Sequence, residues 1–167
     1  MTIQAFNQLS AEEKFNELIK CCGSTKWANE LVKLAPFNSL ESIIADSDFI
    51  WNRCVDADFR EAFSHHPKIG DVKSLEKKFA STKQWAAGEQ AAVSKASQEI
   101  LEKLAQGNEA YEKKFGYIFI VCATGKTAEE MLDLLNQRLP NAATIELGIA
   151  AAEQNKITHI RIKKLLE

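Results

Sequence analysis

The stretch "FSHHPKIGDV", residues 63–72, places two adjacent histidines before a proline, in a chain that otherwise favours helices. Proline disfavours helical backbone in the residue before it, so we expect His66 at a forced helix exit, extended and at the edge of a loop. Catalytic groups often occupy such positions, and imidazole titrates near neutral pH. Taken alone, the local sequence still favours a polar turn, with His65 facing outward.

Two charged residues fall on helix faces that are otherwise apolar. Glu89 lies four residues after Trp85, and both share a face with further apolar residues. Arg161 likewise lies four residues after Ile157. A carboxylate on such a face loses solvation, so its pKa should rise, whereas arginine stays charged and needs an anion. In the structural alternatives, these two residues pair with each other or Arg161 extends to the surface. In the functional alternative, both join His66 in an acid–base site where Arg161 binds an anion.

Other candidate sites fail on spacing. The stretch "YIFIVCATGKT" would need a glycine five residues before Gly125 to form a phosphate-binding loop, and that residue is Ile120. The histidines form neither an H-x-x-x-H nor an H-E-x-x-H pair, so we expect no metal. The four cysteines have no C-x-x-C spacing, which indicates reduced, mostly buried thiols in a cytosolic protein.

The elements that must position these residues are nearly all helices. Capping boxes at Ser10–Glu13 and Thr127–Glu130 open helices that run to about residues 22 and 139. Further helices are expected near residues 25–34, 39–50, 56–66, 74–79 and 82–116, and from 142 to the C-terminus, with a possible break at Gly107. The only strand candidate is "YIFIVCA". We therefore predict an all-α, single-domain helical bundle over residues 1–167, with about 7–9 helices and one short extended segment near 117–123.

Composition excludes several classes of protein. The chain has 167 residues, and 46% hydrophobic composition is enough to bury a core. Its 21 basic and 23 acidic residues leave a formal charge of -2, which provides no broad field for nucleic acid or acidic membranes. The longest apolar runs fall far short of the ~20 residues of a membrane helix, and the N-terminus lacks the basic start and apolar core of a signal peptide. We expect a cytoplasmic protein without nucleic-acid or membrane partners.

Four motifs, in order, resemble the OHCU decarboxylase family. They are His66-Pro67 followed by Lys-Ile-Gly, then Gly88-Glu89-Gln90, then "YEKKFGYIFIVCATG", and finally "ITHIRIKKLL". The single dipeptides are common, whereas the "Y-x-x-K-F-G-Y-x-F-I" stretch and the ordered set are specific, and the likeness covers nearly the whole chain. OHCU is 2-oxo-4-hydroxy-4-carboxy-5-ureidoimidazoline, an intermediate of urate breakdown.

The resemblance implies an all-helical, homodimeric enzyme of purine degradation that uses no cofactor and no metal. Its catalytic histidine corresponds to His66, which would act with Glu89 and Arg161. Many members have serine or threonine where this chain has Ala86, and a second arginine where it has His159. The implied substrate-binding residues are Pro67, Ala86, Ala87, Gly88, Gln90, Phe119, Ile120, Val121, Cys122 and Ala123.

The implied reaction is decarboxylation of OHCU to (S)-allantoin. The substrate carries its carboxylate beside a ring C=N, which accepts the electron pair that CO2 leaves behind, so no organic cofactor is needed. His66 would transfer the proton, Glu89 would orient the ureido arm, and Arg161 would pair with negative oxygen. Two alternatives stay open: a non-catalytic helical binding module with a buried Glu89–Arg161 pair, and a decarboxylase or hydrolase acting on another ureido compound.

Overall fold

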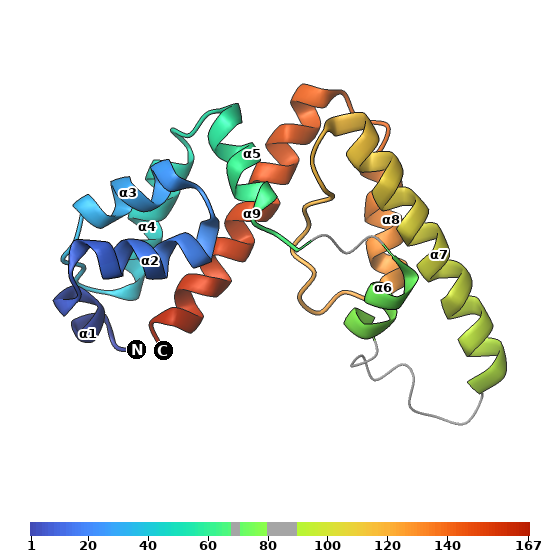
Figure 1. The fold of residues 1–167 in the computed structure, drawn as a ribbon, viewed down its shortest axis with the longest axis horizontal. Coiled ribbons are helices and arrows are strands. Elements are labelled where there is room, and N and C mark those ends of the chain that lie inside the picture. The colour runs from blue at the N-terminus through green and yellow to red at the C-terminus, as the bar shows by residue number, and fades with distance from the viewer. Residues whose placement is uncertain (68–70, 80–89) are drawn as a thin grey trace. The chain divides into compact units, whose positions relative to one another are not determined.

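The described residues of the computed structural model form nine α-helices and no β-strand (Figure 1). The description covers residues 1–67, 71–79 and 90–167, and at residues 78 and 90–96 it extends to the backbone only. The helices are α1 Ile3–Gln8, α2 Ala11–Cys22, α3 Thr25–Lys33, α4 Leu40–Trp51, α5 Asp56–Ser64, α6 Val72–Phe79, α7 Gln90–Phe115, α8 Ala128–Arg138 and α9 Ala143–Leu165. The predicted all-α fold is confirmed.

Local capping sets the helix ends where the sequence predicted them. The Ser10 hydroxyl accepts from the Glu13 amide at 3.2 Å, and the Glu13 carboxylate accepts from the Ser10 amide at 2.8 Å. Thr127 and Glu130 form the same reciprocal pair at the start of α8. Gly23 ends α2 with a φ of 85°, a left-handed conformation that suits glycine.

Two helices differ from the expectation. α1 was not predicted, because six residues span less than two turns and bury only Phe6, which leaves no periodicity to detect. α7 continues through Gly107 without a break. A β-carbon at Gly107 would collide with the Leu135 side chain of α8, so this glycine allows two helices to approach closely. The predicted start of this helix near residue 82 lies outside the described residues, and its end before Gly116 is confirmed.

The chain forms two compact units, each assembled from separate stretches. The first contains residues 1–66, 120–122 and 147–167, and the second contains residues 67–119 and 123–146. A single domain over 1–167 stays a prediction. No helix within the described ranges is both long and apolar enough to cross a membrane.

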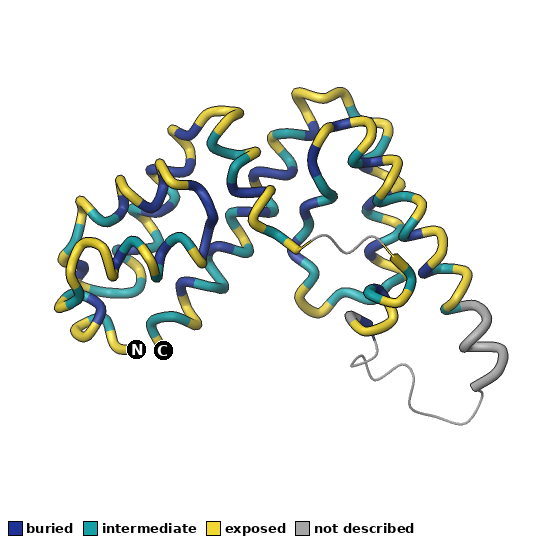
Figure 2. Tube along the Cα trace, viewed as in Figure 1, coloured by how far each residue is buried: buried dark blue, intermediate teal, exposed yellow. Residues whose placement is uncertain are grey.

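The first unit packs α1–α5 with most of α9. Trp27 of α3 is fully buried, and its indole N–H lies 3.2 Å from the Ser47 hydroxyl of α4. The Trp51 indole donates to the carbonyl oxygen of Ala151 at 3.0 Å, which ties α4 to α9. Buried residues alternate with exposed ones along these helices (Figure 2). α9 is therefore part of the core of this unit.

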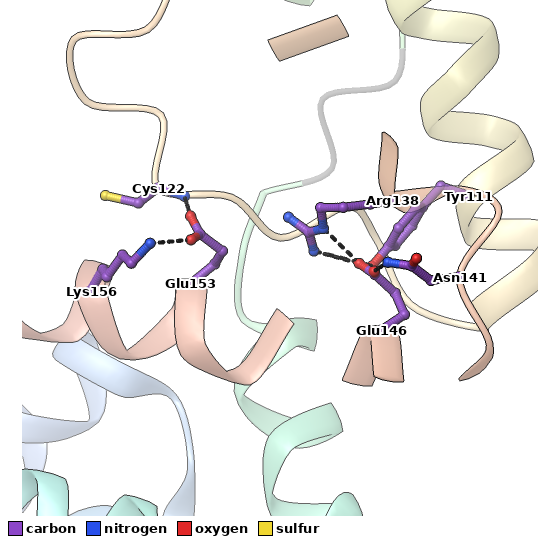
Figure 3. Close-up of polar contacts among 7 residues, drawn as sticks. All are labelled: Tyr111, Cys122, Arg138, Asn141, Glu146, Glu153 and Lys156. Atoms are coloured by element: carbon purple, nitrogen blue, oxygen red, sulfur yellow. Dashed lines mark hydrogen bonds and ion pairs between the residues drawn. The ribbon is translucent and has the colours of Figure 1, made fainter. Parts of the chain in front are cut away.

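The second unit contains a buried polar cluster. Glu146, fully buried, accepts from the Tyr111 hydroxyl at 2.5 Å and from Arg138 Nη2 at 2.6 Å (Figure 3). Asn141 donates to its other oxygen at 3.0 Å, and the Arg138 guanidinium lies 4.6 Å from the centre of the Phe119 ring. Burial, together with the hydrogen bond to Glu146, raises the pKa of Tyr111 far above its ordinary value. This cluster satisfies its own charges, so we assign it a structural role.

The segment 117–123 connects α7 to α8 and has no regular secondary structure. Its strand-like composition reflects burial, because Tyr117, Ile120 and Cys122 are all buried. No other segment of the described chain pairs with it as a ladder, so the strand that its composition suggested does not form.

Candidate active site

His66 lies at the exit from α5, as the proline predicted. The helix ends at Ser64, His65 is its C-cap, and the backbone N–H of His66 donates to the carbonyl of Phe63 at 3.2 Å. His65 is exposed, whereas His66 is half-buried. The two neighbouring histidines therefore differ in exposure.

A buried glutamine of α9 binds the His66 ring. His66 Nε2 lies 2.5 Å from Gln154 Oε1, and the Gln154 amide nitrogen donates to the Thr158 hydroxyl at 3.3 Å. The Thr158 hydroxyl donates to the Gln154 backbone carbonyl at 3.0 Å. Gln154 is 0% exposed and Thr158 is 1% exposed. The imidazole is thus held by a polar chain that water does not reach.

The hydrogen-bonded residues Gln154 and Thr158 lie on the buried face of α9. This face differs from the one that we expected. Every fourth residue from Glu146 is buried, and this row consists of Glu146, Ala150, Gln154, Thr158 and Ile162. The row that contains Ile157 and Arg161 is only half-buried, so Arg161 flanks the core instead of facing into it. Three polar residues in the true row weaken its apolar pattern, and the neighbouring row carries more apolar side chains. Periodicity therefore favoured the wrong face.

Arg161 contacts the C-terminal end of α2. Its Nη1 lies 3.3 Å from the carbonyl oxygen of Lys20 and 3.4 Å from that of Cys21. Such carbonyls carry the partial negative charge of a helix end. Within the described ranges this guanidinium contacts no carboxylate, and its other N–H groups keep their capacity for an anion. Arg161 follows Gln154 by seven residues, so both project from one side of α9, about 10 Å apart along its axis.

The segment 120–122 also attaches to α9. Glu153, the residue before Gln154, accepts from the backbone N–H of Cys122 at 2.8 Å through one carboxylate oxygen (Figure 3). Its other oxygen accepts from Lys156 at 2.5 Å. Cys122 is one of the implied substrate-binding residues, and its backbone amide is engaged by Glu153. Consecutive residues of α9 therefore hold two segments that the sequence motifs had singled out separately.

The remaining predicted site residues are placed in part. Pro67 is exposed, Val121 and Ala123 are half-buried, and Phe119 packs in the second unit beneath Arg138. Gln90 is the first residue of α7, and its side chain is not described. Ala86, Ala87, Gly88 and Glu89 lie outside the described residues. The structure thus brings His66, Cys122 and Arg161 to one helix and does not test the place of Glu89.

Three residues of this site were missed from sequence: Glu153, Gln154 and Thr158. The test that singled out Glu89 and Arg161, a polar residue within an apolar helix face, applies also to Gln154 and Thr158. Because both are uncharged, this signal is weaker for them than for a glutamate or an arginine. Glu153 carried no signal, since a glutamate three residues before a lysine is typical of a solvated helix face.

The cysteines are buried, and none forms a disulfide. Burial raises the pKa of Cys21 to about 11 and that of Cys22 to about 12, so both thiols stay protonated at neutral pH. The Thr158 side chain lowers the pKa of Cys22, but the effect of burial is larger. Cys21 and Cys22 are therefore packing groups and not nucleophiles.

The comparisons with known proteins show which family this chain belongs to. The family model of OHCU decarboxylase matches residues 7–163. The chain belongs to the OHCU decarboxylase family. It is 40% identical over 145 residues to a uric acid degradation bifunctional protein of Arabidopsis thaliana, which covers 87% of this chain and 45% of that protein. A bifunctional uric acid degradation protein of Bacillus sp. strain TB-90 is 25% identical over 167 residues, 99% of this chain and 32% of its own length. The chain spans less than half the length of these two relatives.

Solved structures support the fold of this family member. A crystal structure of OHCU decarboxylase in the presence of (S)-allantoin superposes with a TM-score of 0.70 at 38% identity, and covers 90% of this chain and 97% of that one. A crystal structure of (S)-allantoin synthase superposes with a TM-score of 0.72 at 20% identity, which supports the fold alone.

Proposed function

We propose that this chain catalyses the cofactor-independent decarboxylation of OHCU to (S)-allantoin in urate degradation. The observation that carries the proposal is the position of His66, held at a helix exit through Nε2 on a buried glutamine. A polar turn would need no such partner. Membership in the OHCU decarboxylase family then supplies the reaction that a positioned imidazole would serve.

His66 transfers the proton in this proposal. Loss of CO2 leaves an electron pair that the ring C=N accepts, and a proton must then reach the neighbouring carbon from one face to give a single enantiomer. General acid–base catalysis by a positioned group typically contributes about 10²–10⁴-fold. Arg161 pairs with negative oxygen of the substrate through the guanidinium N–H groups that α2 does not occupy. Glu89 orients the ureido arm.

The pocket in this proposal is completed by residues from three stretches of chain. Pro67, the run 86–88 and Gln90 contribute to substrate binding, and the run 119–123 supplies backbone groups. The bond between Glu153 and the Cys122 amide supports this role, because it fixes the segment to the same helix as Gln154. We also propose that the enzyme is a cytoplasmic homodimer without a bound metal or organic cofactor, as the family resemblance implies.

The test generates OHCU in situ from urate with the two preceding enzymes of the pathway and follows allantoin by circular dichroism. We expect the wild-type protein to produce optically active allantoin much faster than the slow, racemic spontaneous decay. His66→Asn should lower turnover by about 10²-fold or more. His65→Asn is the matched control, since His65 is exposed. No acceleration by the wild type, or equal losses in the two variants, would reject the proposal.

A second variant separates catalysis from a structural charge pair. If Glu89 acts on the substrate, Glu89→Gln should abolish turnover with little change in melting temperature. If Glu89 and Arg161 form a buried structural pair in a binding module, the same change should lower the melting temperature sharply. The contact of Arg161 with the α2 carbonyls favours the first outcome, because these carbonyls already satisfy part of its charge.

A further inference from the structure

The hydrogen bonds behind His66 have a fixed direction. The Thr158 hydroxyl has one proton, and it points to the backbone carbonyl of Gln154 at 3.0 Å. Toward the Gln154 side chain this hydroxyl can therefore only accept, so the amide NH2 of Gln154 faces Thr158 at 3.3 Å. The amide oxygen is left to face His66. Because a carbonyl oxygen cannot donate, the proton of this 2.5 Å hydrogen bond belongs to His66 Nε2.

This direction suits an imidazole that gains and loses a proton. Nε2 carries hydrogen in both the neutral Nε2–H tautomer and the imidazolium, so the bond to Gln154 persists through a full cycle. With the amide reversed, its NH2 would face Nε2–H of the imidazolium, and two donors would oppose each other in a buried place. Gln154 and Thr158 are uncharged, and Cys22 behind them is protonated, so none of the three neutralises the imidazolium by charge.

We infer that Gln154, oriented by Thr158, is a positioning residue that holds His66 in the Nε2–H tautomer and leaves Nδ1 as the nitrogen that exchanges the catalytic proton. This inference rests on the proposed function for its catalytic meaning. The structural part of the inference is that Nε2 of His66 carries the proton, and this does not depend on any enzymatic activity. Nε2 is bound to a buried acceptor, so whatever else the ring contacts, the basic lone pair of neutral His66 is on Nδ1.

Nitrogen NMR tests the tautomer directly. The uniformly ¹⁵N-labelled full chain has three imidazoles, and comparison with His66→Asn assigns the signals of His66. Above the pKa of the ring we expect a long-range proton–nitrogen correlation with Nε2 protonated and Nδ1 unprotonated. In Gln154→Leu the ring should give averaged signals of the two tautomers. A wild-type His66 protonated on Nδ1, which the reversed amide would require, would overturn the inference.

Kinetics test the catalytic consequence. Gln154→Leu should lower kcat by about 10- to 100-fold, a part of the contribution of general acid–base catalysis, with a smaller change in KM. Because the amide oxygen favours the imidazolium, its loss should lower the pKa seen in the pH–rate profile, and Gln154→Glu should raise it. A reversed amide predicts the opposite shift for the leucine variant. Gln137→Leu on α8, an exposed glutamine, is the control for the same exchange of side chains.

The two proposals fail in distinguishable ways. If the wild type does not accelerate allantoin formation, the proposed function falls, and the NMR tautomer still decides the structural part. If the wild type is active but Gln154→Leu keeps its kcat, its pH profile and its tautomer, the proposed function stands and the role of Gln154 is refuted. Both proposals are supported if wild-type His66 has a fixed Nε2–H tautomer, and if Gln154→Leu shows averaged tautomers and a lowered kcat.

Discussion

Glu153→Leu is the substitution that best tests how the segment 120–122 is held. The carboxylate accepts from the Cys122 amide at 2.8 Å and from Lys156 at 2.5 Å, but these contacts differ in exposure. The Glu153 side chain is 14% exposed, whereas Lys156 is 63% exposed. The two contacts should therefore contribute unequally, and substitutions can separate them.

The expected magnitudes follow from the charge and exposure of each contact. A hydrogen bond from an amide to a carboxylate contributes about 1.5–3 kcal/mol, and an ion pair with an exposed lysine contributes about 0–1 kcal/mol. Glu153→Leu should then lower the free energy of unfolding by roughly 2 kcal/mol, or about 4–8 °C in melting temperature for a chain of this length. Glu153→Gln retains an acceptor oxygen and should lose about half as much. Lys156→Ala should lower the melting temperature by no more than about 2–4 °C.

The assay combines thermal melting with allantoin formation on the same preparations. Because the bond fixes the segment 120–122, its loss should also lower kcat/KM by roughly 10-fold or more, with Glu153→Gln between the leucine variant and the wild type. If Lys156→Ala is as harmful as Glu153→Leu, the ion pair and not the amide bond holds the segment. If Glu153→Leu changes neither stability nor activity, the segment is held by other contacts and the reasoning fails.

Three further predictions concern stability and turnover. Glu146→Leu leaves the Arg138 charge buried at 7% exposure, so the free energy of unfolding should fall by about 3–5 kcal/mol in denaturant titrations; a loss under about 1 kcal/mol would refute a buried pair. Gly23→Ala places a β-carbon on a residue with left-handed backbone, 2.7 Å from the β-carbon of His65. The melting temperature and the turnover should therefore both fall. An unchanged turnover would show that the chain at the end of α5 adapts. Burial raises the pKa of Cys22 from 9.0 to about 12, so the folded state binds more protons than the unfolded state between these values. The free energy of unfolding should therefore decrease as pH rises above about 9, and it should decrease less steeply in Cys22→Ala. An equal slope against pH in both proteins would contradict this.

Short-range features were predictable because each depends on residues close together in the sequence. The capping pair Ser10–Glu13 lies within one turn, and Pro67 acts on the residue directly before it. Gly23 and Gly116 adopt left-handed backbone where helices end, as expected of glycine. The α-helical class, most helix ends and the position of His66 just beyond its helix were therefore available from sequence, and the motif order indicated the family.

Long-range features depended on the tertiary structure. His66 and Gln154 are 88 residues apart, and nothing local to either predicts that they meet. The choice between two neighbouring faces of α9 was also undetermined, since both carry apolar residues and the buried one includes Glu146, Gln154 and Thr158. Packing decides such cases, because a polar side chain is tolerated inside only where a specific partner satisfies its hydrogen bonds. The sequence by itself thus determined which histidine leaves its helix, and the tertiary structure alone decided which nitrogen of that histidine is held.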